Sequence, residues 1–293
     1  MYRKLLICCF ISTLFVGCSK KENKIRVSLS SPEDMTEIVE GNCTVKWEAP
    51  DSSPDWLYDV YHGASERQCS KIGSDLKETS FTIMDLPYNC SYHWFVKAKR
   101  GQGEEVMSEI RSFRLVVQRG TFVDTRDHQE YNWIQLGEKR WMAENMSLET
   151  ENGWWALEND EKNIQKYGRL YNWEMAQKVC PEGWHLPSQR EWEELMNIPV
   201  DATRGKYCLL PAGKIGSNSI GFDIQPGGML HWTGKFYDGG MTGWFWSSTV
   251  LDENGYVPIY MQNCYAENNY YNSMFSQPFS PGRGAHSVRC VMD

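Results

Sequence analysis

Residues 180–195 read CPEGWHLPSQREWEEL, and this stretch predicts a turn that leads directly into a short helix. Ser188 is a preferred N-cap residue, and Glu191 follows three positions later, which is the capping-box pattern. Trp192 and Leu195 supply an apolar face for the helix that starts there. The segment therefore joins a turn to a helix, and it could be a catalytic motif, a sugar-binding motif or scaffolding.

Around this stretch, residues 118–293 mix strand and helix patterns. The segment 121–146, TFVDTRDHQEYNWIQLGEKRWMAENM, predicts a hairpin with LGEKRW as its turn. A helix is predicted from Asn172 to Cys180, because apolar residues recur there every fourth position. Gly, Asn, Ser and aromatic residues dominate the rest, and SVRCVMD (287–293) predicts a closing strand. We therefore expect an α+β domain with long loops.

The preceding residues, 25–117, predict an all-β sandwich. CTVKW, YDVYHG, SFTIMDL, SYHWFVKAK and SEIRSFRLV alternate apolar and polar residues, and turn-rich segments separate them. Only three of the thirteen tryptophans lie before residue 118, which supports two domains. Trp47 ends an early strand, and Leu86 lies six residues before Tyr92. The segment resembles a fibronectin type III domain with Tyr92 in its tyrosine corner, and we expect it to act as a spacer.

The N-terminus predicts where the protein resides. Arg3 and Lys4 precede LLICCFISTLF, an apolar run too short to span a bilayer with ease, and FVGC closes it. This pattern resembles the bacterial lipoprotein signal, which implies cleavage before Cys18 and acyl chains on that residue. We expect residues 1–17 to be a signal peptide and residues 18–24 a lipidated tether, at the outer membrane or cell surface.

The charge of the chain limits its partners. The formal net charge is −8, and it becomes more negative once Arg3 and Lys4 leave with the signal peptide. An acidic chain is a poor candidate for binding nucleic acid. Attachment to the membrane is therefore expected to come from the lipid and not from a basic patch.

A family resemblance covers most of the second half of the chain. It rests on the order and spacing of six segments: FVDTRDHQEY, WMAENM, GRLYNWEMAQKVCPEGWHLPSQREW, GFDIQPGG, WFWSST and SVRCVMD. These look like the successive signatures of the Fibrobacter succinogenes major paralogous domain. The resemblance implies a secreted or surface-attached bacterial protein, and it carries over no reaction.

The opening stretch has a second, more distant resemblance. A helix ending in Cys180, then Gly-Trp-His-Leu and a capped helix, is similar to the start of C-type lectin-like domains. That resemblance implies a disulfide from Cys180 to Cys290, which leaves Cys208 for Cys264. LPSQREWEEL also looks like part of the formylglycine-generating enzymes, which share that fold at a distance. Both likenesses indicate that the stretch is scaffolding, and we expect His185 to be structural.

The other cysteines agree with an oxidising compartment. Cys43, Cys69 and Cys90 lie in the N-terminal part. Cys43 and Cys90 sit on strands that face each other in such sandwiches, and their pairing is one possibility left open. The sequence contains no CxxC pair and no His/Cys cluster with zinc spacing, so no metal or cofactor is expected.

No catalytic constellation stands out. GxSxG, HExxH and P-loop patterns are absent from the sequence. Where calcium-dependent lectins carry EPN or QPD with WND, this chain has QPG at 225–227 and AENN at 266–269. We therefore expect a non-catalytic binding or adhesion module for a glycan or a protein partner. The alternatives are a divergent enzyme of the formylglycine-generating type and a structural component of a cell-surface assembly.

Aromatic residues in loops are the candidate binding groups, because rings near amides and carboxylates suit stacking on sugars or contact with a protein. The competing interpretation is that most of these rings are core. The candidate ligand-binding residues are Trp154, Trp155, Trp232, Tyr237, Trp244, Tyr270 and Tyr271.

Overall fold

The structure is a computed structural model, and it describes residues 25–39, 41–101, 103–198, 220–251, 257–263, 275–279 and 284–292. Cys18, Cys208, Cys264, Tyr270 and Tyr271 lie outside the described residues. In the part that is described, no helix is both long enough and apolar enough to cross a membrane.

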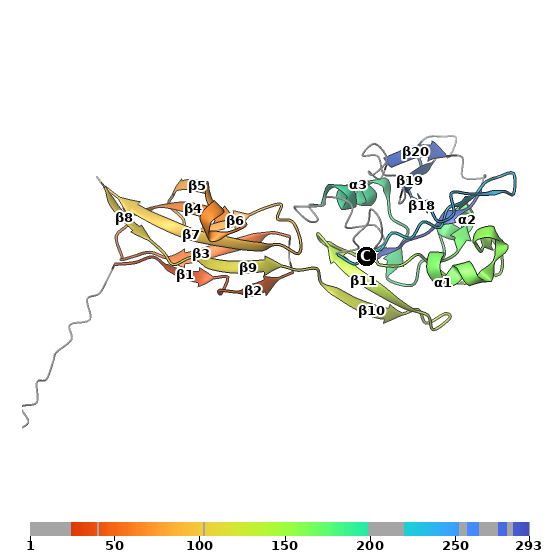
Figure 1. The fold of residues 1–293 in the computed structure, drawn as a ribbon, viewed down its shortest axis with the longest axis horizontal. Coiled ribbons are helices and arrows are strands. Elements are labelled where there is room, and N and C mark those ends of the chain that lie inside the picture. Colours follow the sequence, from red (N-terminus) through yellow and green to blue (C-terminus); the bar gives the residue numbers. More distant parts are fainter. Residues whose placement is uncertain are drawn as a thin grey trace, which may run out of the picture.

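The N-terminal part consists of two β-sheets (Figure 1). One sheet has the order β1-β3-β6, with bounds Ser28–Ser31, Cys43–Glu48 and Ser80–Ile83. The other has the order β2-β9-β7-β4-β5, and β8 pairs with β7. Its strands are β2 Thr36–Ile38, β9 Arg111–Leu115, β7 Ser91–Arg100, β4 Leu57–Gly63, β5 Ser70–Leu76 and β8 Glu104–Met107, and the 3-10 turn η1 spans Glu66–Gln68.

Alternating apolar side chains fill the space between these sheets. Trp47 on β3 packs edge-on against Tyr58 on β4, with ring centroids 5.4 Å apart. Trp94 on β7 is fully buried. The Tyr92 hydroxyl donates to the carbonyl of Pro87 over 2.7 Å, five residues upstream. This bond is the tyrosine corner that the sequence predicted, and it supports the fibronectin type III-like description of this all-β part.

The cysteines of the sandwich are not paired. Cys43 is buried, Cys69 and Cys90 are half-buried, and all three are free thiols. Cys43 pairs with Ile83 inside the small sheet, whereas Cys90 precedes a strand of the large one. The possible bond between Cys43 and Cys90 is therefore not formed, and burial raises the pKa of the Cys43 thiol to about 11.

The described residues of the C-terminal part form three further sheets. The first has the order β10-β11-β12-β22-β15, the second β13-β14-β21-β18-β19-β20, and the third pairs β16 with β17. The bounds of the first sheet are β10 Arg119–Val123, β11 Glu130–Leu136, β12 Lys139–Met142, β22 Val291–Met292 and β15 Trp184–His185. Those of the second are β13 Trp154–Trp155, β14 Leu170–Tyr171, β21 His286–Ser287, β18 Thr242–Trp246, β19 Val257–Asn263 and β20 Phe275–Phe279. The third joins β16 Met229–Leu230 to β17 Phe236–Tyr237.

The predicted hairpin of this part is confirmed. Strands β11 and β12 pair antiparallel, and Leu136 opposite Lys139 places the turn at Gly137 and Glu138. The Gly137 amide donates to the hydroxyl of Tyr88 over 3.1 Å, so this turn contacts the N-terminal part. Strand β10 extends the same sheet by pairing with β11.

The described helices are short. Among the described residues the α-helices are α1 Ile164–Tyr167, α2 Trp173–Ala176 and α3 Gln189–Asn197, with 3-10 turns η2 Leu157–Asn159 and η3 Glu161–Asn163. The predicted helix over 172–180 is only the four residues of α2. Its Asn172 cap accepts from the Met175 amide, but Tyr171 just before it is a strand residue that pairs with Trp154 and His286. The spacing of the apolar residues from Tyr171 on is therefore compatible with a strand as well as with a helix.

Candidate functional site

The CPEGWHLPSQREWEEL stretch forms the junction of the C-terminal part. Strand β15, with Trp184 and His185, pairs with β22, and α3 follows. The predicted capping box is present, because the Ser188 amide donates to Glu191 Oε2 over 2.8 Å and Ser188 Oγ accepts from the Glu191 amide. The segment thus connects β15, at one edge of the first sheet, to the longest described helix.

The Glu191 carboxylate also contacts two side chains that no sequence pattern indicated as its partners. His185 Nε2 lies 2.9 Å from Glu191 Oε1, and the Lys139 ammonium lies 2.9 Å from the same oxygen. Burial acts to raise the pKa of Glu191, but the Ser188 amide, Lys139 and His185 together lower it to about 2. His185 therefore has a structural partner, as the expected scaffolding role requires, and Glu191 ties β12, β15 and α3 together.

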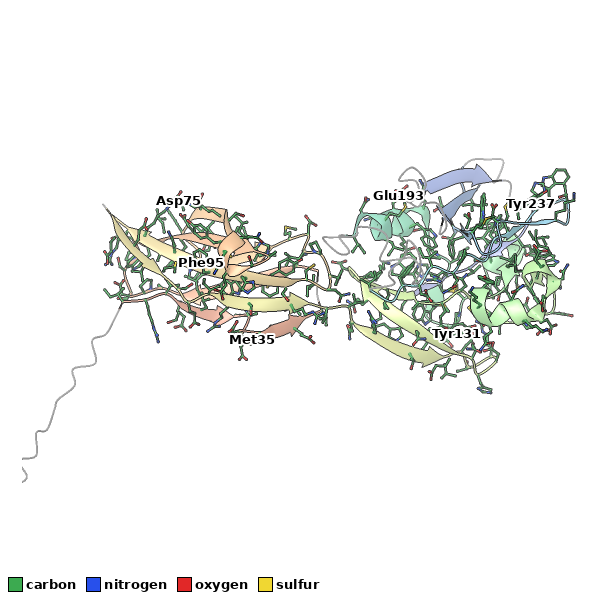
Figure 2. The ribbon with its side chains drawn as sticks, viewed as in Figure 1. Met35, Asp75, Phe95, Tyr131, Glu193 and Tyr237 are labelled. Carbon is green, nitrogen blue, oxygen red and sulfur yellow. A yellow bond between two sulfur atoms is a disulfide. The ribbon has the colours of Figure 1, made fainter. Side chains whose placement is uncertain are left out.

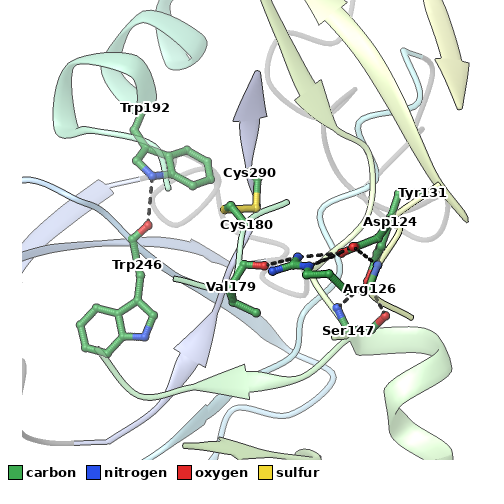
Figure 3. The surroundings of a disulfide bond; sticks show 9 residues. All are labelled: Asp124, Arg126, Tyr131, Ser147, Val179, Cys180, Trp192, Trp246 and Cys290. Carbon is green, nitrogen blue, oxygen red and sulfur yellow. Dashed lines mark hydrogen bonds and ion pairs between the residues drawn. A yellow bond between two sulfur atoms is a disulfide. The ribbon is translucent and has the colours of Figure 1, made fainter. Parts of the chain in front are cut away.

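A disulfide and buried hydrogen bonds complete this junction (Figure 3). Cys180 and Cys290 are bonded, with their Cα atoms 5.8 Å apart, as the lectin-like resemblance implied. The preceding Val179 carbonyl accepts from Arg126 over 2.7 Å, and Arg126 in turn pairs with buried Asp124. To the left of the disulfide in Figure 3, the Trp192 indole donates to the carbonyl of Trp246. This set of contacts forms a cross-linked framework.

Among the residues that the structure describes, the exposed aromatic rings lie on the β16–β17 hairpin. Trp232 is 59% exposed and Tyr237 is 43% exposed, and their rings lie 5.1 Å and 5.5 Å from the ring of His231. We call Trp232 and Tyr237, with His231 between them, the aromatic hairpin. Tyr237 lies at the end of the C-terminal part opposite the N-terminal sandwich (Figure 2).

Backbone bonds hold this hairpin in one conformation. Leu230 exchanges both backbone hydrogen bonds with Ala285, over 2.9 and 2.8 Å, which anchors the base. The His231 amide donates to the Lys235 carbonyl, and Gly234 closes the turn with a φ of +80°, where a side chain would be strained. His231 Nδ1 also lies 2.8 Å from the hydroxyl of Thr233. The rings of Trp232 and Tyr237 therefore project from a hairpin whose base and turn are held by hydrogen bonds.

The structure separates the other candidate residues from this surface. Trp244 is only 6% exposed, and its indole donates to Asp238 Oδ2 over 3.2 Å. The prediction that Trp244 is an exposed anchor is therefore wrong, because all five residues of β18 are buried. Trp244 and Trp232 look alike in the sequence, and only the burial of an interior strand on both faces distinguishes them.

Trp154 and Trp155 are half-buried and have partners. The Trp154 indole donates to the Thr150 carbonyl over 2.8 Å, and the Arg169 guanidinium lies 4.1 Å from its ring centroid. Trp155 packs against the small cluster formed by Leu170, Leu230 and Ala285. Burial therefore explains much of this pair, because β13 pairs with β14 and brings both rings onto the fold.

The comparisons with known proteins bear on this part of the chain. The model of the Fibrobacter succinogenes major domain matches residues 134–292, which is more than half of the chain. The chain belongs to this family. The match includes the capping box, both disulfide cysteines and the aromatic hairpin, so each of these features lies within the Fibrobacter succinogenes major domain. No curated protein matches the sequence.

Among solved structures, the chain is similar to a crystal structure of the FN1–FN3 domains of chicken CNTN1, at 15% sequence identity and a TM-score of 0.25. The alignment covers 44% of this chain and 44% of that one, so this chain spans less than half the length of that structure. The fibronectin type III-like description of the sandwich rests on its two sheets and on the Tyr92 corner.

Proposed function

We propose that this protein is a surface-anchored bacterial lipoprotein whose Fibrobacter succinogenes major domain binds a glycan without catalysing a reaction. The observation that carries the proposal is the aromatic hairpin, where two rings project from a rigid turn beside His231 and Thr233. Aromatic rings next to polar groups suit the mixed apolar and hydroxyl faces of sugars. In the described part of the chain, no group of three or more His, Cys, Asp or Glu side chains is placed to hold a metal ion.

A glycan fits this surface better than a protein partner. An aromatic side chain offers at most about 250 Å², whereas a stable protein interface buries about 800 Å² on each partner. Trp232 and Tyr237 are only partly exposed, so the hairpin is small for such an interface. It matches the size of one or two sugar rings more closely.

We also propose a C-type lectin-like layout for this domain. The Cys180–Cys290 bond, which joins the segment before β15 to the C-terminal strand, supports it. The departures at 225–227 and 266–269 from the calcium motifs support sugar binding that does not need calcium.

Truncation of either exposed ring tests the proposed glycan site. Trp232→Ala and Tyr237→Ala are each expected to weaken binding at least tenfold, because an aromatic anchor contributes about 2 kcal/mol or more. The measurement is a glycan array followed by calorimetry, on the chain without residues 1–17 and with Cys18→Ser. The melting temperature is expected to stay within about 1 °C, because both rings are exposed.

Met241, directly before β18, is also exposed and apolar, so it supplies a matched control. Met241→Ala is expected to leave glycan affinity unchanged. A chelator of calcium is expected to leave glycan affinity unchanged. Full retention of affinity in both ring variants would remove the hairpin from consideration as the binding site.

The membrane anchor is tested separately. We expect Cys18→Ser, expressed with its signal peptide, to move from the membrane fraction to the aqueous phase of a detergent partition. The reason is that each buried methylene of an acyl chain contributes about 0.8 kcal/mol to membrane affinity, and this variant carries none on that residue. The neighbouring Ser19→Ala is the control and should stay with the membrane. Membrane retention of the Cys18 variant would contradict the lipoprotein proposal.

A further inference from the structure

A polar cavity of about 730 Å³ lies beside β11 and α1, and its lining includes no residue of the aromatic hairpin. Four segments that are distant in sequence form it, at 129–131, 144–147, 161–168 and 223–225. Its volume falls within the range of about 300 to 1,000 Å³ that is typical of small-molecule sites. No motif in the sequence pointed to it.

The floor of the cavity is fixed by Asn145, whose side chain is buried. Its amide nitrogen donates to the Tyr167 carbonyl over 2.9 Å, and its oxygen accepts from Arg289 over 2.6 Å. Arg289 is fully buried and also donates to the carbonyl of Asp223 over 3.0 Å. These bonds connect three of the lining segments, so the floor does not have to reorganise when a ligand enters.

A second set of bonds fixes the wall. The Tyr131 hydroxyl accepts from the Ser147 amide over 3.1 Å and lies 2.8 Å from Ser147 Oγ. Gly168 has a φ of +70°, and a Cβ there would lie 2.7 Å from the Met146 carbonyl. Glycine is therefore required at this point, and the chain turns closely around the cavity.

The charges around the cavity select against anions. Glu144, Glu161 and Asp223 contribute carboxylates, whereas Lys166 is the cation among the lining residues. Arg289, buried beneath Asn145, offsets part of this negative charge. Three carboxylates against these two cations leave a site that disfavours a negatively charged ligand and accepts hydrogen-bond donors.

Amide side chains complete the lining. Gln129, Gln165 and Gln225 each offer both a donor and an acceptor. Gln225 Nε2 donates to Asp223 over 2.7 Å, and Gln225 Oε1 is buried without a hydrogen-bond partner among the described residues. A buried acceptor of this kind is unfavourable until a polar group donates a hydrogen bond to it.

From this arrangement we propose that the cavity binds an uncharged sugar unit. A sugar hydroxyl both donates and accepts, so carboxylates and carboxamides on a rigid frame complement it, and the negative charge excludes acidic sugars. The inference deepens the proposed glycan function on which it rests, since it names the ligand class and adds a second point of contact. The hairpin rings would stack on one part of a glycan while this cavity holds another.

The test uses the chain without residues 1–17 and with Cys18→Ser, on an array of neutral and acidic oligosaccharides, followed by calorimetry with the strongest neutral ligand. Glu161 and Gln165 are exposed at the rim, so Glu161→Ala/Gln165→Ala is expected to fold normally and to lose at least tenfold in affinity. Lys162→Ala changes a residue on the same turn but outside the lining, so it is the matched control. Its glycan affinity should stay within twofold of wild type.

The outcomes separate the two sites. If the Glu161/Gln165 variant keeps wild-type glycan affinity while Trp232→Ala loses it, the cavity inference is wrong and the hairpin site stands. If only the Glu161/Gln165 variant loses glycan affinity, the cavity inference stands and the aromatic hairpin is not the anchor. A preference for acidic over neutral glycans, or no binding to neutral glycans, overturns the cavity inference.

Discussion

Removal of the Cys180–Cys290 disulfide is expected to lower the free energy of unfolding of the C-terminal part by about 4 to 5 kcal/mol. The bond joins residues 110 positions apart, and the chain-entropy model assigns about 4.7 kcal/mol to a closed loop of roughly that length. The variant is Cys180→Ala/Cys290→Ala, and the measurement is urea unfolding followed by tryptophan fluorescence. Ten of the thirteen tryptophans lie after residue 118, so the signal reports mainly on this part.

The free thiol Cys69 provides the control for this experiment. Cys69→Ala removes a half-buried sulfur from the sandwich but no cross-link, and it is expected to leave the C-terminal transition unchanged. A loss of less than about 1 kcal/mol in the double variant would contradict the prediction and would mean that the unfolded chain retains structure between the two cysteines.

Trp244→Ala is expected to lower the free energy of unfolding by about 3 to 5 kcal/mol, the usual cost of truncating a buried tryptophan. The ring is only 6% exposed and lies 6.0 Å from the ring of buried His286. Truncation also leaves Asp238 without the indole donor. Chemical denaturation measures the loss directly.

The comparison variant is Trp232→Ala, which changes the same residue type at an exposed position. Its free energy of unfolding is expected to stay within about 0.5 kcal/mol of wild type. Equal stability losses at Trp232 and Trp244 would contradict the distinction between hairpin and core on which the proposed site depends.

Local features of this protein were predictable from the sequence. The capping box needs only Ser188 and Glu191 at a fixed spacing, and the tyrosine corner needs only Tyr92 shortly after a turn, so both were found. The β11–β12 hairpin was found for the same reason, since its turn and strands are adjacent in the chain. The Cys180–Cys290 pair came from a family resemblance and not from the residues themselves.

Features that depend on distant pairing were not predictable. Tyr171 fits a helical pattern, but β13 and β21 place it in a sheet. The exposure of Trp232 and the burial of Trp244 follow from which strands flank them, and neither residue carries that information locally. The polar cavity collects its lining from four separate segments, and ordinary Gln, Glu and Asn residues at such distances form no recognisable motif.

The position of β22 determines when the C-terminal domain can fold. Val291, in the last few residues of the sequence, pairs with Trp141 on one side and with His185 on the other, and Cys290 beside it supplies half of the disulfide. A chain emerging from the ribosome or an export channel can complete the sandwich early, because its strands are all present by residue 115. The C-terminal part lacks this interior strand of its first sheet until residues 291–292 have emerged. The first sheet therefore cannot close before β22 has emerged, and a nascent chain halted ten residues before β22 would present an open sheet between β12 and β15 to whatever chaperone receives it.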